Sequence, residues 1–208
     1  MKILVIGAAG KTGEAIVKQA LGRGHTVTAF VHEAKGFEGD GARVIEGNVL
    51  DAAVLESAIA GQDAVLDALG GHTPWKESTL ETNAARNVIN GMKKHEVKRL
   101  LVVSAIGVSG TEDLVPGWYE HLIMPTLLRG AMHDKEHMEP IVEASGLEWT
   151  LVRPGHLVDG EATGKIHFFE PGSGEIAHKI TRADVATFML DLLANDLYKR
   201  QAANIASN

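Results

Sequence analysis

The apolar residues of this chain form short continuous runs that alternate with stretches of helical periodicity. The runs predict buried strands, and they lie at residues 2–6, 25–31, 44–45, 63–69, 98–104 and 148–153. The periodic stretches predict helices at 14–23, 77–94 and 126–144, a shorter helix from Asp51 to Gly61, and a last helix after the N-cap Thr181. Strands that alternate with helices form right-handed crossovers, so we predict an α/β fold with a doubly wound parallel sheet flanked by helices.

The second half of the chain has a less regular pattern. Residues 107–125 contain Trp118 and Tyr119 in an irregular stretch, which is typical of a loop that covers a substrate. Residues 165–169 predict a short edge strand. We therefore expect a single domain over residues 1–208, with a small C-terminal substrate-covering region.

Composition and charge narrow the class of protein. The chain has 208 residues, of which 45% are apolar and 23% charged, as in an ordinary globular domain. Its formal net charge of −7 argues against a general nucleic-acid binder. The absence of cysteine excludes disulfides and thiolate metal sites. No apolar run is long enough to span a membrane and the first strand starts at residue 2, so we expect a cytoplasmic protein without a signal peptide.

Glycines follow the first predicted strand directly. Gly7, Gly10 and Gly13 separate this strand from the first helix, with the spacing GxxGxxG instead of the commoner GxGxxG. Such a turn lets the backbone approach a ligand closely, and the N–H groups and dipole at the helix start favour a diphosphate. A plain structural turn is the alternative. Because the glycines lie directly between a buried strand and a helix, we predict a nucleotide-binding turn.

Several segments besides the glycine turn match one protein family. They are GAAGKTG at 7–13, GNVLD at 47–51, GQDAVLDALG at 61–70, VVSA at 102–105, ASGLEWTLVRPGHL at 144–157 and ITRADVA at 180–186. With these segments the chain resembles the atypical short-chain dehydrogenases/reductases, specifically the NAD(P)H-binding, NmrA-like branch that contains biliverdin reductase B, a flavin reductase. The resemblance implies a Rossmann-like fold and a dinucleotide cofactor. It leaves the chemistry open, because the family includes reductases, epimerases and redox sensors that bind the nucleotide without turnover.

The resemblance also implies which residues contact the cofactor. They are Gly7, Ala9, Gly10, Lys11, Thr12, Gly13, His32, Asn48, Val49, Ala68, Leu69, Gly70, Ser104, Lys135 and Pro154. His32 ends the second strand, where the family often has Arg and where NADP is distinguished from NAD. Lys11 and Lys35 offer positive charge for a 2′-phosphate, whereas Glu33 could serve an NAD-type site. We predict that NADPH is favoured over NADH.

The Tyr-x-x-x-Lys pair of standard short-chain dehydrogenases is missing, because Ile123 lies four residues after Tyr119. The resemblance implies Ser104, Lys135 and His156 as the residues of the chemistry. Ser104 would lie beside the nicotinamide, Lys135 would bind the nicotinamide ribose or a substrate carboxylate, and His156 could protonate a reduced flavin or tetrapyrrole. Each residue also has an ordinary interpretation. Ser104 could be a strand-end serine bonded to backbone, Lys135 a solvated helix lysine and His156 an exposed loop histidine.

The function predicted from these residues is reduction of a planar conjugated acceptor such as a flavin, a quinone or biliverdin. Trp118, Tyr119, Met124 and His156 would form its pocket. A nucleotide-sensing binding protein stays open as an alternative, and so does a nucleotide-sugar epimerase, although that chemistry depends on the absent tyrosine. We expect a small-molecule substrate and neither a nucleic-acid nor a membrane partner, and the sequence leaves the oligomeric state open.

One further string of residues is typical of a metal site. Residues 133–137 read HDKEH, which fits the HxxEH pattern of a class of zinc peptidases. That pattern needs a third ligand and its own structural context, and here it lies within a nucleotide-binding chain. We therefore predict no metal site.

Overall fold

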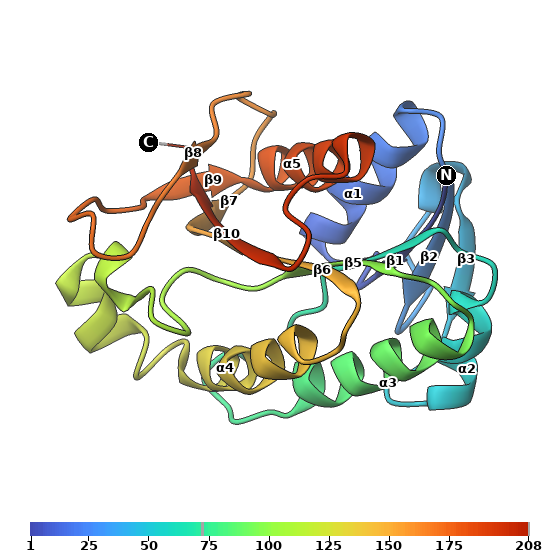
Figure 1. Cartoon of the computed structure of the whole chain (residues 1–208), viewed down its shortest axis with the longest axis horizontal. Helices are drawn as coiled ribbons and strands as arrows, with labels where there is room; N and C mark the ends of the chain where they lie inside the picture. Colours follow the sequence, from blue (N-terminus) through green and yellow to red (C-terminus); the bar gives the residue numbers. More distant parts are fainter. Residues whose placement is uncertain (72, 208) are drawn as a thin grey trace.

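The central feature of the protein is an eight-stranded sheet with the strand order β3-β2-β1-β4-β5-β6-β10-β8 (Figure 1). It is seen in a computed structural model that describes residues 1–71 and 73–207. The first six strands in chain order are β1 (Lys2–Ile6), β2 (Thr26–Val31), β3 (Arg43–Glu46), β4 (Ala64–Asp67), β5 (Arg99–Val103) and β6 (Glu148–Pro154). They pair in parallel, as predicted. The Rossmann-like, doubly wound α/β prediction is confirmed.

The register of these strands brings their carboxyl ends to one edge of the sheet. Ile6 at the end of β1 pairs with Asp67 at the end of β4, and Asp67 pairs with Val102 in β5. The strands are apolar because both faces of the sheet are covered: Ile3 to Ile6 have no exposed surface. Ligands of such sheets bind at the carboxyl edge, and the helices that follow β1, β4 and β5 begin there.

Helices cover the sheet in two layers (Figure 1). One layer contains α1 (Lys11–Gly22) and α5 (Arg182–Asn195), and the other contains α2 (Ala52–Ile59), α3 (Leu80–Lys94) and α4 (Arg129–Glu143). Each layer packs on its own apolar core. Among the helices that the structure describes, none is both long and apolar enough to cross a membrane.

Helix starts follow the local chemistry of the chain. Asp51 caps α2 as predicted, because its carboxylate accepts hydrogen bonds from Ala53 N at 3.1 Å and Val54 N at 3.2 Å. The helix α1 begins at Lys11, earlier than the predicted residue 14, because Gly10 is already extended and takes the N-cap position. The first turn of α1 therefore contains three of the predicted cofactor residues, Lys11, Thr12 and Gly13.

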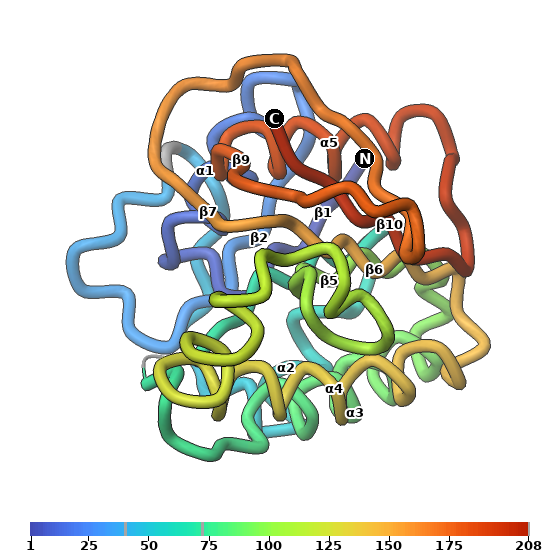
Figure 2. The backbone as a smooth tube through the Cα atoms, turned by 90° about the vertical axis from the view of Figure 1, so that its left-hand side faces the viewer, coloured from blue at the N-terminus to red at the C-terminus, as the bar shows by residue number. Residues whose placement is uncertain are grey.

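The C-terminal region departs most from the sequence prediction. The strand β10 (Gln201–Ala206) was not predicted, and it lies parallel to β6. The predicted edge strand is β8 (His167–Phe168), antiparallel to β10, while β7 (His156–Val158) and β9 (Lys179–Thr181) form a separate parallel pair. The largely irregular segments 105–128 and 159–178, the second of which contains β8, extend past the carboxyl edge of the sheet. One lies on the α4 side and the other on the α5 side (Figures 1 and 2).

Candidate functional site

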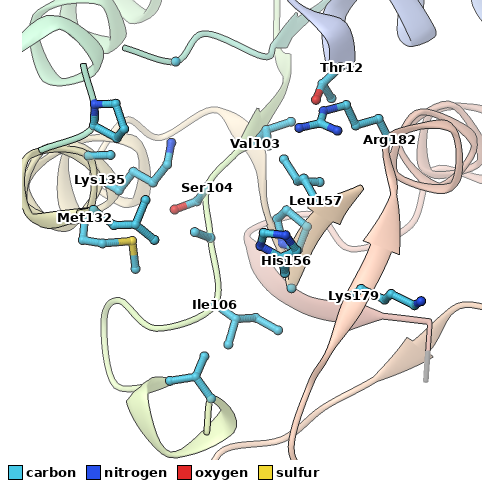
Figure 3. A pocket seen from close by; sticks show the side chains of 18 of the residues that line it. Thr12, Val103, Ser104, Ile106, Met132, Lys135, His156, Leu157, Lys179 and Arg182 are labelled. Carbon is cyan, nitrogen blue, oxygen red and sulfur yellow. The ribbon is translucent and has the colours of Figure 1, made fainter. Parts of the chain in front are cut away.

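A cavity of about 1120 Å³ opens at the carboxyl edge of the sheet (Figure 3). The glycine turn, the ends of β4, β5 and β6, and the two irregular segments enclose it. Of the predicted site residues, Gly10, Lys11, Thr12, Ala68, Leu69, Gly70, Ser104, Lys135, Pro154 and His156 line it. Gly7, Ala9, Gly13, His32, Asn48 and Val49 do not belong to its lining.

Each of the three positions in the turn requires glycine for a different structural reason. Gly7 has a φ of +71°, and a Cβ there would lie 2.7 Å from the Ala68 carbonyl oxygen. A Cβ on Gly13 would lie 2.2 Å from the Gly7 carbonyl oxygen. These two glycines let the turn pack onto α1 and onto the chain after β4. Gly10 lines the cavity and brings no capping side chain, so the first-turn N–H groups of α1, which have no intrahelical acceptor, are open to a diphosphate.

One carboxylate holds two cations at the glycine end of the cavity. Asp159 Oδ2 lies 2.6 Å from Lys11 Nζ, and Asp159 Oδ1 lies 2.5 Å from Arg182 NH1. The hydrogen bond from Lys11, together with the nearby Arg182 charge, lowers the pKa of Asp159. Figure 3 shows Arg182 beside Thr12. Lys11 also lines a smaller pocket together with residues 36–39, just after Lys35, so its contact with a 2′-phosphate stays a prediction.

The predicted adenosine contacts lie outside the cavity, at the ends of β2 and β3. His32 is exposed, and the Asn48 side chain accepts a hydrogen bond from Leu50 N at 2.9 Å within its own turn. Val49 is only 7% exposed and packs in the core beneath α2 to α4. The side chain of Val49 is therefore a core residue, and only its backbone could meet a ligand. Contacts of His32 and Asn48 with adenosine stay predictions.

Ser104 follows β5 directly and is 3% exposed. Its N–H donates to Val152 O at 2.7 Å, whereas its hydroxyl oxygen has no hydrogen-bond partner among the described residues. The alternative of a strand-end serine bonded to backbone through its side chain is therefore wrong. A buried unpaired hydroxyl costs free energy unless something completes its hydrogen bonds, and this one lines the cavity. It is placed to bond a ligand.

Lys135 is not the solvated helix lysine that the sequence left as an alternative. Its Nζ lies 2.5 Å from Glu81 Oε2, and the two side chains are 13% and 6% exposed. Burial raises the pKa of the Glu81 carboxyl, and the Lys135 charge lowers it in part. Sequence reasoning missed Glu81, because an acidic residue in the first turn of a helix is ordinary at a solvated helix start.

Asp67 is a second buried acid that the sequence did not single out as functional. Burial raises its pKa to about 6, against the hydrogen bond that its carboxylate accepts from Leu69 N at 2.9 Å. The charge of Glu81 raises this pKa further, and that of Lys135 lowers it. An aspartate inside the apolar run 63–69 was the signal that could have found it. Asp67, Glu81 and Lys135 therefore form one electrostatically coupled group beside the cavity.

The predicted acceptor pocket is correct in part. Trp118, Tyr119 and His156 line the cavity, and burial raises the pKa of Tyr119. Met124 does not line it, because its side chain packs against Gly107. Met132 lines the cavity instead. Figure 3 places Ser104 between Lys135 and Met132 on one side and His156 on the other.

The HxxEH string lies on α4 without forming a metal centre. His137 Nδ1 lies 2.8 Å from the carbonyl oxygen of His133, and the two imidazole rings lie 4.3 Å apart between centroids. Within residues 1–71 and 73–207, no group of three or more His, Cys, Asp or Glu could hold a metal ion.

Comparison with known proteins decides the family. A family model described as NAD(P)H-binding matches residues 7–196. The chain belongs to this NAD(P)H-binding family. The predicted resemblance to an NAD(P)H-binding family is confirmed, whereas the role of the glycine turn stays a prediction.

Similar proteins cover almost the whole chain. The uncharacterized protein YwnB of Bacillus subtilis is 28% identical over 221 residues, which cover 100% of this chain and 99% of YwnB. ChuY of Escherichia coli, described as an anaerobillin reductase, has a TM-score of 0.83 at 24% identity and covers 100% of this chain and 97% of its own. A short-chain dehydrogenase/reductase from Veillonella parvula in complex with NADP has a TM-score of 0.82 at 16% identity. The match covers 99% of this chain and 94% of that one. The two solved structures share the fold with this NAD(P)H-binding chain.

Proposed function

We propose that the protein is an NAD(P)H-dependent reductase of a planar conjugated acceptor of the flavin, quinone or bilin type. The observation that carries this proposal is the buried, unpartnered hydroxyl of Ser104 in a cavity that continues to the glycine turn. A purely structural cleft would not keep a polar group desolvated and unpaired at its centre. The cavity is also large enough for a nicotinamide ring and a second flat ring system.

The residues present fit the cofactor. Gly10, Lys11 and Thr12 at the start of α1 would hold the diphosphate, and Ser104 and Lys135 would contact the nicotinamide end. Bound NAD(P)H supplies a hydride. The chain's own part is to exclude water with Trp118 and the residues around it, to orient both rings, and to deliver the proton that must follow the hydride.

Two groups of the chain can deliver that proton. The Lys135 ammonium is held by Glu81 on one side of Ser104, and the His156 imidazole lies on the other side. Either group replaces the missing tyrosine of standard short-chain dehydrogenases as a proton donor. The Glu81 carboxylate holds the Lys135 side chain in place, as an ammonium before the transfer and as an amine after it.

We infer that NADPH is the preferred cofactor, because His32 and Lys35 are exposed near the end of β2. Glu46, the acidic residue at the end of β3, is held by the Ala34 N–H at 3.0 Å. Because this contact holds the carboxylate on the backbone, His32 and Lys35 are left for a 2′-phosphate. We also expect the reaction to occur in the cytoplasm, where cells keep this cofactor reduced.

The test is NADPH oxidation by the purified protein with FMN, riboflavin, menadione and biliverdin in turn. A bilin is the first choice because the structural neighbour ChuY is described as an anaerobillin reductase. We expect turnover with at least one acceptor. Tight NADPH binding without any turnover would reject the enzyme in favour of a nucleotide sensor, and no binding of NADPH or NADH would reject both.

A further inference from the structure

The wall of the cavity has a charge opposite to that of the whole chain. Its described lining residues include Lys11, Lys135, Lys179 and Arg182 but a single carboxylate, that of Glu81. The chain as a whole has a formal net charge of −7. A cationic cavity with apolar walls attracts anions strongly, because its low dielectric concentrates the field.

Three of the four cations already have a carboxylate partner. Lys11 and Arg182 share Asp159, and Lys135 is paired with Glu81. Lys179 differs from these, since no acidic side chain in the described part of the chain lies within ion-pair distance of it. In Figure 3 Thr12 and Arg182 lie together at the upper end of β9, whereas the Lys179 side chain leaves the lower part of this strand. This charge is therefore separate from the diphosphate end of the cavity.

A second unpartnered hydroxyl accompanies Lys179. Ser207 follows β10 directly and lines the cavity, and its hydroxyl oxygen is buried without a hydrogen-bond partner among the described residues. The Ser207 N–H donates to the Lys179 carbonyl oxygen at 2.7 Å, which fixes the two residues side by side. His156 is the register partner of Lys179 in the β7–β9 pair. All three residues line the same cavity.

We propose that His156, Lys179 and Ser207 form an anion subsite that binds an anionic substituent of the acceptor. This proposal rests on the proposed reductase function and names its substrate class: a planar conjugated ring that carries a carboxylate or phosphate. Ile106, Val115 and Trp118 supply an apolar wall for the ring. The subsite would then hold the charged edge of the same molecule through a charge-assisted hydrogen bond from Lys179.

The experiment compares acceptors that differ only in charge. Biliverdin, with free propionates, is compared with biliverdin dimethyl ester, and FMN with riboflavin. With the wild-type protein we expect a lower KM for the charged member of the pair that is reduced. A preference confined to the biliverdin pair identifies a carboxylate, and one confined to the FMN pair identifies a phosphate.

The same acceptors are then tested with Lys179→Gln and Ser207→Ala. Loss of one charge-assisted hydrogen bond predicts a KM about tenfold higher for the charged acceptor in Lys179→Gln, and a smaller increase in Ser207→Ala. The KM for the uncharged acceptor and the Kd for NADPH should stay the same. Lys98→Gln removes another exposed charge just before β5, at the opposite edge of the sheet, and should change nothing.

Quenching of tryptophan fluorescence by the acceptors, with NADP⁺ present, gives the same comparison without turnover. Equal affinity of wild type for the charged and uncharged members would overturn the anion subsite and leave the reductase intact. The anion subsite would also be overturned if Lys179→Gln lost the same affinity for the charged acceptor as for the uncharged one. If the protein neither binds nor reduces any acceptor, the proposed function itself is rejected.

Discussion

The ammonium of Lys135 on α4 lies 2.5 Å from the carboxylate of Glu81 on α3, and both side chains line the cavity. This contact makes α3 part of the site, although the sequence motifs pointed only to the glycine turn, the ends of the strands and α4. It also gives a largely buried lysine a carboxylate partner.

Glu81→Gln should destabilise the protein, because it leaves the Lys135 charge largely buried without its partner. The expected loss is about 3 kcal/mol of the free energy of unfolding, measured in urea. Glu81→Gln combined with Lys135→Met should lose less than the sum of the two single variants. Glu77→Gln is the matched control, since the exposed pair of Glu77 with Arg129 predicts a change below about 1 kcal/mol. Equal losses in the two single glutamine variants would contradict the buried pair.

Asp67→Asn should make the protein more stable at neutral pH. In the unfolded chain the carboxyl ionises near its ordinary pKa of 3.8, whereas in the folded protein the pKa is about 6. Between these values the unfolded state loses its proton first, so the free energy of unfolding falls as pH rises. The variant should gain up to about 3 kcal/mol at pH 7 and nothing at about pH 3. Urea unfolding between pH 3 and pH 7 measures this gain in stability, with Glu161→Gln at an exposed position as the control. A stability difference that does not change with pH would contradict the raised pKa of Asp67.

Ser104→Ala should separate stability from function. Because the hydroxyl is buried and unpaired, its removal should leave the free energy of unfolding unchanged or raise it by about 1 kcal/mol. The value of kcat/KM should fall about tenfold or more, since a hydrogen bond to the bound ligands is lost. Ser145→Ala is the opposite control: that buried hydroxyl accepts from Leu147 N at 3.1 Å, so stability should fall and activity should persist. Full activity of Ser104→Ala would exclude a role in the site.

Gly13→Ala should disrupt the start of α1. The added Cβ would meet the Gly7 carbonyl oxygen at 2.2 Å, and a backbone atom cannot move aside cheaply. We expect a loss of at least about 2 kcal/mol of stability together with weaker NADPH binding. Gly22→Ala, at the other end of the same helix, has no atom within 4 Å of the new Cβ and should be neutral or stabilising by up to about 1 kcal/mol. Calorimetric titration and urea unfolding of both variants measure this contrast, which a tolerated Gly13→Ala would contradict.

Asp159→Asn should tighten dinucleotide binding. The exposed carboxylate neutralises Lys11 and Arg182, so its removal leaves both cations for the diphosphate. We expect a Kd for NADPH lower by a few-fold at low salt, with a smaller difference at high salt because exposed charges are screened. Asp191→Asn removes the carboxylate that pairs with Arg23, outside the cavity lining, and should leave the Kd unchanged. Weaker binding in Asp159→Asn would mean that this carboxylate positions the two cations instead of competing for them.

The sequence predicted β1, β2, β4, β5 and β6 because burial on both faces makes them continuous apolar runs. The edge strand β3 is mostly exposed, and Val44 and Ile45 were its only apolar signal. It missed β10 because QAANIA contains a single large apolar residue, Ile205, although Ala203 and Ile205 are buried. It missed β7 and β9 because three residues are too few for a periodicity. These missed strands contain His156 and Lys179, and Ser207 follows β10 directly.

Within the site, the sequence predicted which residues line the cavity better than it predicted what their side chains contact. Ser104 and Lys135 line the cavity as expected, but nothing in the local pattern indicated that Lys135 would be buried against Glu81. The two residues are 54 positions apart, and only the packing of α3 on α4 brings them together. Lys11 shows the same limit, because its partner Asp159 lies 148 residues away.

A side chain on α4 also determines where α3 begins. Thr79 at the N-cap accepts a hydrogen bond from the Asn83 side chain but caps no backbone N–H of α3. The Asp134 carboxylate does so instead, accepting from Glu81 N at 2.9 Å and from Thr82 N at 3.0 Å. Asp134 and Lys135, neighbours in the chain, thus hold the backbone and the side chain of Glu81 from the same helix. Fraying of either helix end would release the other, so amide protons of the two ends should exchange with deuterium as one cooperative unit.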